Sequence, residues 1–150
     1  SSWDFDIPDH KRPLAERGFN DAHVIAEKFS ESFTMPDAVF SSHAVRAYTT
    51  CAIFMETLNI PKEKLTVTQE LYDFGGSQVS NFIKSLPDEY QNVMVFGHNN
   101  AFTAVSNIFG NVYIDNVPTA GLVQIQFEEN LWKNLKKGTT LLTLFPKQWR

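Results

Sequence analysis

Two turns in the sequence carry side chains that could bind a phosphoryl group. Arg46 follows the apolar segment 38–40, and His98 follows the apolar segment 93–96 in the stretch "VMVFGHNN". Arginine offers fixed N–H donors to phosphate oxygens, and histidine can neutralise charge or transfer a proton. If both side chains face one crevice, they form a small cationic pocket beside the N–H groups of helix N-termini. Such a pocket suits a phosphoryl group.

Each of these two residues also has an ordinary structural interpretation. Arginine is mostly exposed in proteins, so Arg46 is also interpreted as a surface ion-pair partner. His98 at a strand end is interpreted either as a hydrogen-bonded turn residue or as a catalytic one. Spacing alone therefore indicates a candidate phosphate pocket and leaves its role open.

The elements that position these turns alternate between strands and helices. Apolar residues at i, i+3, i+4 and i+7 predict amphipathic helices, and short apolar or alternating segments predict strands. The predicted strands are 37–42, 64–71, 92–97, 121–128 and 139–145, and the predicted helices are 19–29, 42–58, 77–86 and 101–110. Ser42 is the predicted N-cap of the second helix, and Gly110 is predicted to end the fourth.

This alternation predicts an α/β fold, a three-layer α/β/α sandwich with a mostly parallel central sheet. Only the polar connection 129–138 joins the last two strands, so we expect them to form an antiparallel pair at one edge. Ligands of such sheets bind beyond the carboxyl ends of the strands, which places Arg46 and His98 on one side of the molecule. The 150 residues are expected to form a single domain.

The composition limits the expected partners. A net charge of −4 and a pI near 5.5 give no general electrostatic reason to bind nucleic acid. No apolar run reaches the roughly 18 residues of a membrane span, so no membrane contact is predicted. Cys51 is the single cysteine, which excludes an internal disulfide and fits a reducing cytoplasm. No cluster has the spacing of metal ligands, and no cofactor is predicted.

Three segments resemble successive landmarks of the histidine phosphatase superfamily, which has the phosphoglycerate mutase fold: "KRPLAERG" (11–18), "SSHAVRAYTTCAIF" (41–54) and "VMVFGHNNAF" (93–102). Further segments resemble its small phosphohistidine phosphatase, or SixA-like, branch: "ELY" (70–72), "VPTAGLVQIQF" (117–127) and the tail "LFPKQWR". The resemblance implies a cofactor-independent hydrolase whose histidine is phosphorylated before inorganic phosphate is released. The implied substrate is a phosphorylated protein domain or a small phosphorylated metabolite.

The resemblance also assigns roles to individual residues. Arg46 and His98 match the second arginine and second histidine of the family's phosphate clamp, and Ser1 would lie beside the phosphoryl group. The family's first strand and its Arg-His motif have no counterpart in the sequence as given. We therefore expect the nucleophilic histidine upstream of Ser1 in a longer parent protein, and residues 1–150 alone to be inactive. If the chain is complete, the alternative is a non-catalytic pseudo-phosphatase that binds phosphate or phosphoproteins.

Other residues near the predicted pocket have open roles. Glu70 and Asp73 are candidates for a general acid that protonates the leaving group, or they are ordinary loop carboxylates. A phosphohistidine leaving group is an easily protonated nitrogen, so a dedicated acid is little needed. Arg12 is expected to pair with a carboxylate that holds the opening loop over the pocket, and His43 could line the rim. The other three histidines do not fit the position of the nucleophile; they are His10, His23 and His43.

Overall fold

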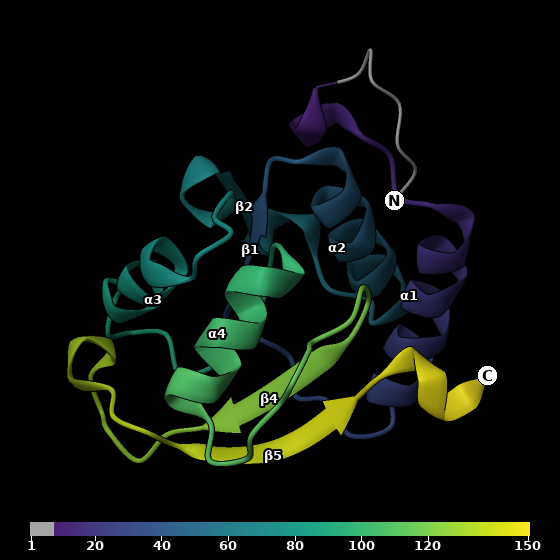
Figure 1. Ribbon diagram of the computed structural model, residues 1–150. Helices are drawn as coiled ribbons and strands as arrows, with labels where there is room; N and C mark the ends of the chain where they lie inside the picture. Colours follow the sequence, from purple (N-terminus) through teal and green to yellow (C-terminus); the bar gives the residue numbers. More distant parts are fainter. Residues whose placement is uncertain (1–7) are drawn as a thin grey trace.

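The structure, a computed structural model, describes residues 8–150, so Ser1 lies outside the described residues. Strands and helices alternate along the chain as predicted (Figure 1). Their bounds are α1 (Glu16–Phe29), β1 (Ala38–Ser42), α2 (Val45–Thr57), β2 (Leu65–Thr68), α3 (Ser77–Lys84), β3 (Val93–Phe96), α4 (Asn99–Phe109), β4 (Leu122–Gln126) and β5 (Thr139–Leu144). Two 3₁₀ turns lie near the candidate site: η1 (Asp9–Lys11) and η3 (Gln69–Leu71).

β1 is the centre of a parallel three-stranded sheet with the order β2-β1-β3. All five β1 residues are buried, as expected for a strand covered on both faces. β4 and β5 form an antiparallel pair as predicted, but the expectation that this pair lies at one edge of the parallel sheet is wrong within residues 8–150. The pair is, however, a sheet of its own: within residues 8–150, β3 is paired only with β1 and β4 only with β5. One edge of β3 and one edge of β4 therefore have no neighbouring strand in the described part of the chain.

Helices cover both faces of the strand layer. Alternate residues of β1 point to opposite faces, so Val39 and Phe40 belong to different core clusters. Val39 packs with buried residues of the first two helices: Ala22, Ile25, Ala26 and Phe29 of α1, and Cys51, Ile53, Phe54 and Met55 of α2. Phe40 packs with buried residues of the other two: Val79 of α3, and Ala101, Val105 and Phe109 of α4. This is the predicted three-layer α/β/α arrangement.

The ends of two helices differ in detail from the predictions. Ser42 is the last residue of β1, and the N-cap position of α2 is Ala44, whose backbone N–H donates to the Ser42 hydroxyl. Gly110 ends α4 as predicted, but its φ is −89°, an ordinary extended conformation. The glycine is required for space instead, because a Cβ there would lie 2.3 Å from Oγ1 of Thr140.

Within residues 8–150, no helix has both the length and the apolar character needed to cross a membrane.

Candidate active site

The candidate site lies where β1 and β3 end side by side. Ser41 of β1 is in register with Phe96 of β3, so the residues that follow reach the same edge of the sheet. His98 occupies the N-cap position of α4, and Arg46 stands in the first turn of α2. The structure therefore brings the two predicted residues together, with Nη2 of Arg46 3.4 Å from Nδ1 of His98.

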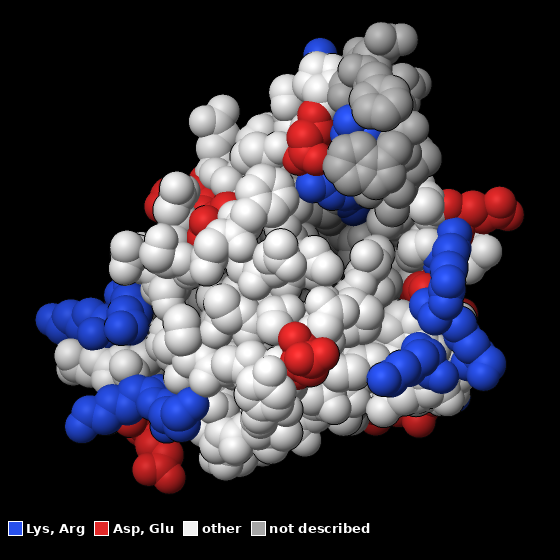
Figure 2. All heavy atoms as spheres, viewed as in Figure 1, with Lys and Arg blue, Asp and Glu red and all other residues white. Residues whose placement is uncertain are grey.

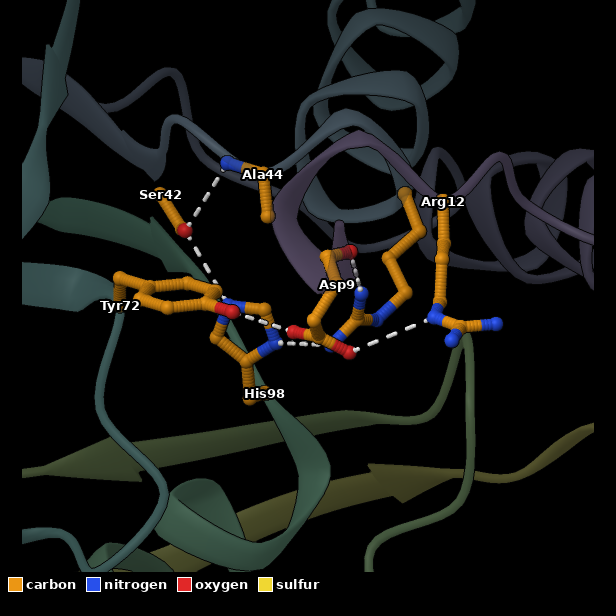
Figure 3. Close-up of polar contacts among 7 residues, drawn as sticks. Asp9, Arg12, Ser42, Ala44, Tyr72 and His98 are labelled. Carbon is orange, nitrogen blue, oxygen red and sulfur yellow. Dashed lines mark hydrogen bonds and ion pairs between the residues drawn. The ribbon is translucent and has the colours of Figure 1, made fainter. Parts of the chain in front are cut away.

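The hydrogen bonds of His98 define its tautomer. A guanidinium group has only donors, so Nδ1 of His98 must accept from Nη2 of Arg46. The proton of the neutral ring is then on Nε2, which donates to Oγ of Ser42 at 3.1 Å. The same hydroxyl oxygen accepts the backbone N–H of Ala44 at 3.2 Å. Ser42 thus fixes the imidazole against the turn between β1 and α2 (Figure 3).

Burial keeps His98 neutral. The residue is only 4% exposed. The rings of Tyr72 and Phe74 pack against it with centroids at 5.1 and 4.8 Å. Burial and then the adjacent Arg46 cation lower the pKa of His98 from 6.5 to about 4, although Asp9 acts in the opposite direction. At neutral pH the site therefore presents an imidazole lone pair beside a guanidinium cation.

A carboxylate of the chain itself lies against Arg46. Oδ2 of Asp9 is 3.1 Å from Nη2 of Arg46, and the backbone oxygen of Asp9 accepts Nη1 at 2.8 Å. The hydroxyl of Tyr72 donates to the same Oδ2 (Figure 3). Nε of Arg12 lies 4.0 Å from Oδ1 of Asp9. This ion pair lies within the opening loop, so the expectation that Arg12 holds that loop over the pocket stays a prediction.

These contacts set the charge of the Asp9–Tyr72 pair. The Tyr72 hydrogen bond, followed by Arg46, lowers the pKa of Asp9 below its usual value even though burial opposes the shift. Burial and the hydrogen bond to Asp9 raise the pKa of Tyr72. Asp9 is therefore an anion and Tyr72 a neutral donor at neutral pH. Figure 2 shows acidic and basic side chains in contact at the top of the drawn face, where η1 lies in Figure 1.

Two further histidines lie close to this group. The ring of His43 packs against Tyr72 at 5.1 Å, in line with its predicted place at the rim, and against His10 at 5.6 Å. Nδ1 of His43 is buried and has no hydrogen-bond partner within residues 8–150. His23 lies on α1 with its ring against Phe19.

The two candidate acids occupy different environments. Both carboxylate oxygens of Asp73 accept backbone N–H groups, one from Gly75 at 3.1 Å and the others from the start of α3: Gly76, Gln78 and Val79, at 3.0, 3.0 and 3.2 Å. Asp73 is therefore a cap of α3. Glu70 is an exposed residue of η3. Within residues 8–150, no group of three or more His, Cys, Asp or Glu residues could hold a metal ion.

Three site residues were not predicted from the sequence as members of the phosphate pocket: Asp9, Ser42 and Tyr72. Asp9 stands two residues before the segment "KRPLAERG", and Tyr72 ends the segment "ELY". Both segments carry the family resemblance, which is the signal that could have drawn attention to them. Ser42 was assigned to a helix cap, although its hydroxyl contacts His98.

The sequence matches no protein-family model and no curated protein. Solved structures are similar over nearly the whole chain. A protein from Nakamurella multipartitia that is assigned as the phosphohistidine phosphatase SixA has a TM-score of 0.77 at 18% identity, covering 93% of this chain and 88% of that chain. The corresponding protein from Agrobacterium tumefaciens has a TM-score of 0.76 at 22% identity, covering 96% and 90%. A protein histidine phosphatase SixA complexed with tungstate has a TM-score of 0.75 at 20% identity, covering 95% and 90%.

The chain has the SixA fold. The fold expected from the resemblance is thereby confirmed, including the parallel sheet flanked by helices. Within this SixA fold, Arg46 and His98 lie at the carboxyl edge of the parallel strands, where ligand sites of such sheets form.

Proposed function

We propose that this protein is a phosphohistidine phosphatase in which Arg46 and His98 bind the transferred phosphoryl group. The observation that carries the proposal is their meeting beyond adjacent parallel strands, where Arg46 already holds a carboxylate anion. The SixA fold supports it, and one structure with that fold is a complex with tungstate, an oxyanion with four oxygens. The substrate class is a phosphorylated protein domain, with small phosphorylated metabolites as the alternative.

Arg46 and His98 would contribute to the reaction in different ways. The guanidinium group donates to two phosphoryl oxygens and stabilises the charge that develops on them in the transition state. His98 is neutral before binding, and a phosphoryl dianion beside it would raise its pKa, so that it can take up a proton and donate a further hydrogen bond. Ser42 would keep the ring oriented through Nε2.

The proposed reaction has two displacements. A nucleophilic histidine, implied by the family resemblance, forms a bond from its ring nitrogen to phosphorus while the bond from phosphorus to the substrate nitrogen breaks. The substrate imidazole leaves with a proton from solvent. Water then attacks the phosphorylated histidine, releases inorganic phosphate and regenerates the nucleophile. Arg46 and His98 would hold the phosphoryl oxygens through both steps.

The test is turnover of a phosphohistidine-containing protein domain by the full-length protein and by Arg46→Ala and His98→Gln. We expect each substitution to lower the release of phosphate at least about 100-fold, because each removes a group that contacts the transferred oxygens. Arg150→Ala is the matched control, since Arg150 also pairs with a carboxylate, Asp21, but on α1. Its activity should be unchanged.

The outcomes separate the proposal from its alternatives. Full activity in Arg46→Ala or His98→Gln would contradict the assignment of the clamp. A folded full-length protein that binds phosphate through Arg46 without turnover would be the pseudo-phosphatase. Glu70→Gln should leave phosphohistidine hydrolysis unchanged, whereas a selective loss of activity on phosphate esters would identify Glu70 as a general acid for those substrates.

A further inference from the structure

Asp9 holds the same guanidinium nitrogen that a phosphoryl group would need. Nη2 of Arg46 lies 3.1 Å from Oδ2 of Asp9 and 3.4 Å from Nδ1 of His98. An anion held between Arg46 and His98 therefore meets the N–H groups that now face the Asp9 carboxylate. A carboxylate and a phosphoryl group offer a guanidinium the same pair of acceptor oxygens. They are consequently competitors for one binding group.

Charge makes joint occupancy unfavourable. Asp9 is an anion, since the hydrogen bond from Tyr72 and the Arg46 cation both lower its pKa. A phosphoryl group brings further negative charge to within a few ångströms, and two like charges at one site repel. Within residues 8–150, the cations in direct contact with Asp9 are Arg46 and Arg12. The carboxylate must therefore withdraw before a dianion can take its place on Arg46.

The same contact closes the site. His98 is 4% exposed and Ser42 is fully buried, so a ligand reaches them only if a covering group moves. Tyr72, which packs against His98, is tied to Asp9 by its hydroxyl. Moving Asp9 away from the site should require little free energy, because η1 is a single 3₁₀ turn and none of its three residues is buried. Its displacement would expose little apolar surface.

We propose that Asp9 is an internal ligand of the anion site and that a phosphoryl group binds by displacing it together with η1. The inference rests on the proposed function, because it takes Arg46 and His98 as the phosphoryl site. Asp9 thus sets the affinity of the site: it occupies Arg46 when no ligand is bound and excludes weak anions. A phosphoryl dianion displaces it because the dianion interacts more strongly with Arg46 and His98.

The first experiment measures tungstate and inorganic phosphate binding to the full-length protein by calorimetry. Asp9→Asn removes the charge and keeps the size of the side chain, so both anions should bind about tenfold more tightly, a gain of about 1.4 kcal/mol. Asp21→Asn is the control, because it breaks a carboxylate–arginine pair with Arg150 elsewhere and should leave affinity unchanged. Unchanged or weaker anion binding in Asp9→Asn would overturn the proposal, the weaker case showing that Asp9 positions Arg46.

A second experiment follows the displacement in the unaltered protein. Tungstate should accelerate tryptic cleavage after Lys11, which lies in η1, and should leave cleavage after Lys62 and Lys64 unchanged. Slower or unaltered cleavage after Lys11 at saturating tungstate would overturn the displacement. Arg46→Ala distinguishes the two hypotheses. If Arg46→Ala still binds tungstate, the proposed function fails. If Arg46→Ala loses tungstate binding but Asp9→Asn binds tungstate no more tightly than the unsubstituted protein, only the role of Asp9 is contradicted.

Discussion

His98 combines a buried position with a defined pattern of hydrogen bonds. Nε2 donates to Ser42, and Nδ1 faces the guanidinium of Arg46. Arg46 favours the neutral ring, because a second ring proton on Nδ1 would point at its cation. The imidazole is thus ready to receive a proton only when an anion enters the site.

This environment predicts that stability falls as pH is lowered from 6.5 to about 4. The pKa of His98 is about 4 in the folded protein against 6.5 ordinarily, so in this window the unfolded chain binds more protons and unfolding becomes easier. The difference corresponds to on the order of 3 kcal/mol. Urea unfolding at several pH values gives the free energy of unfolding as a function of pH. Between pH 4 and 6.5 this free energy should change less steeply with pH for His98→Gln than for the unsubstituted protein.

The control for this pH dependence is His23→Gln, because His23 is exposed on α1. Its stability should follow the same slope as that of the unsubstituted protein. An unaltered slope in His98→Gln would show that His98 does not titrate differently on folding.

At the residue scale, the sequence predicted Arg46 and His98 because both follow apolar strands, and strand ends are identifiable from local pattern. It did not predict that Asp9 and Tyr72 share a hydrogen bond, since they are 63 positions apart. That contact depends on how the opening segment crosses the sheet edge. No local periodicity encodes it.

At the scale of elements, the carboxylate of Asp73 caps the N-terminus of α3. Asp73 accepts four backbone N–H groups, three of them from Gly76, Gln78 and Val79. Asp73→Ala should lower the free energy of unfolding by about 2 kcal/mol, because buried N–H groups lose their acceptor. Asp73→Asn should lose less, since its amide oxygen can still accept, and chemical denaturation measures both.

The exposed Asp88 provides the comparison, and Asp88→Ala should leave stability unchanged. If Asp73→Ala were as stable as the unsubstituted protein but inactive on phosphate esters, Asp73 would be a general acid and not a cap.

The predicted stripe of α1 is buried in the structure, namely Ala22, Ile25, Ala26 and Phe29. Periodicity determines such a face directly, because every third or fourth residue returns to the core. The beginning of α2 was harder to predict, because Ser42 belongs to the cap-forming type but its hydroxyl is directed to His98. A residue preference cannot distinguish a serine that caps its own helix from one that contacts a side chain at the start of another helix.

At the scale of the whole molecule, β1 joins two core clusters on opposite faces of the layer. Val39 belongs to one cluster and Phe40 to the other. Val39→Ala should cost about 1–2 kcal/mol and Phe40→Ala about 3–5 kcal/mol of stability. Because both side chains stand on one strand, we expect each substitution to weaken both helical layers in a single transition.

Two probes measure this cooperativity. Burial raises the pKa of Cys51 in α2 to about 12, so its labelling by a thiol reagent reports opening of one layer. Hydrogen exchange of α4 amides reports opening of the other. Both rates should rise by the same factor in Phe40→Ala, whereas an increase confined to α4 would show that the two layers open independently.

The separation of the β4–β5 pair from the parallel sheet was not predicted. The sequence shows two apolar strands joined by a polar connection, which defines an antiparallel pair but not its neighbours. Pairing between β3 and β4 would depend on segments some 25 residues apart in the chain being brought side by side. Individual strands can be predicted from the local sequence pattern, whereas which strands pair with each other depends on the whole fold.

The complete burial of β1 has a consequence for how this sequence can change over evolutionary time. All five of its residues are buried, Val39 and Phe40 belong to core clusters on opposite faces, and its end carries Ser42 against His98. Such a strand has no solvent-facing position at which substitutions accumulate neutrally. Among related chains, 38–42 should vary little even where the surrounding helices have diverged, and this short block would be the most reliable landmark for aligning distant relatives.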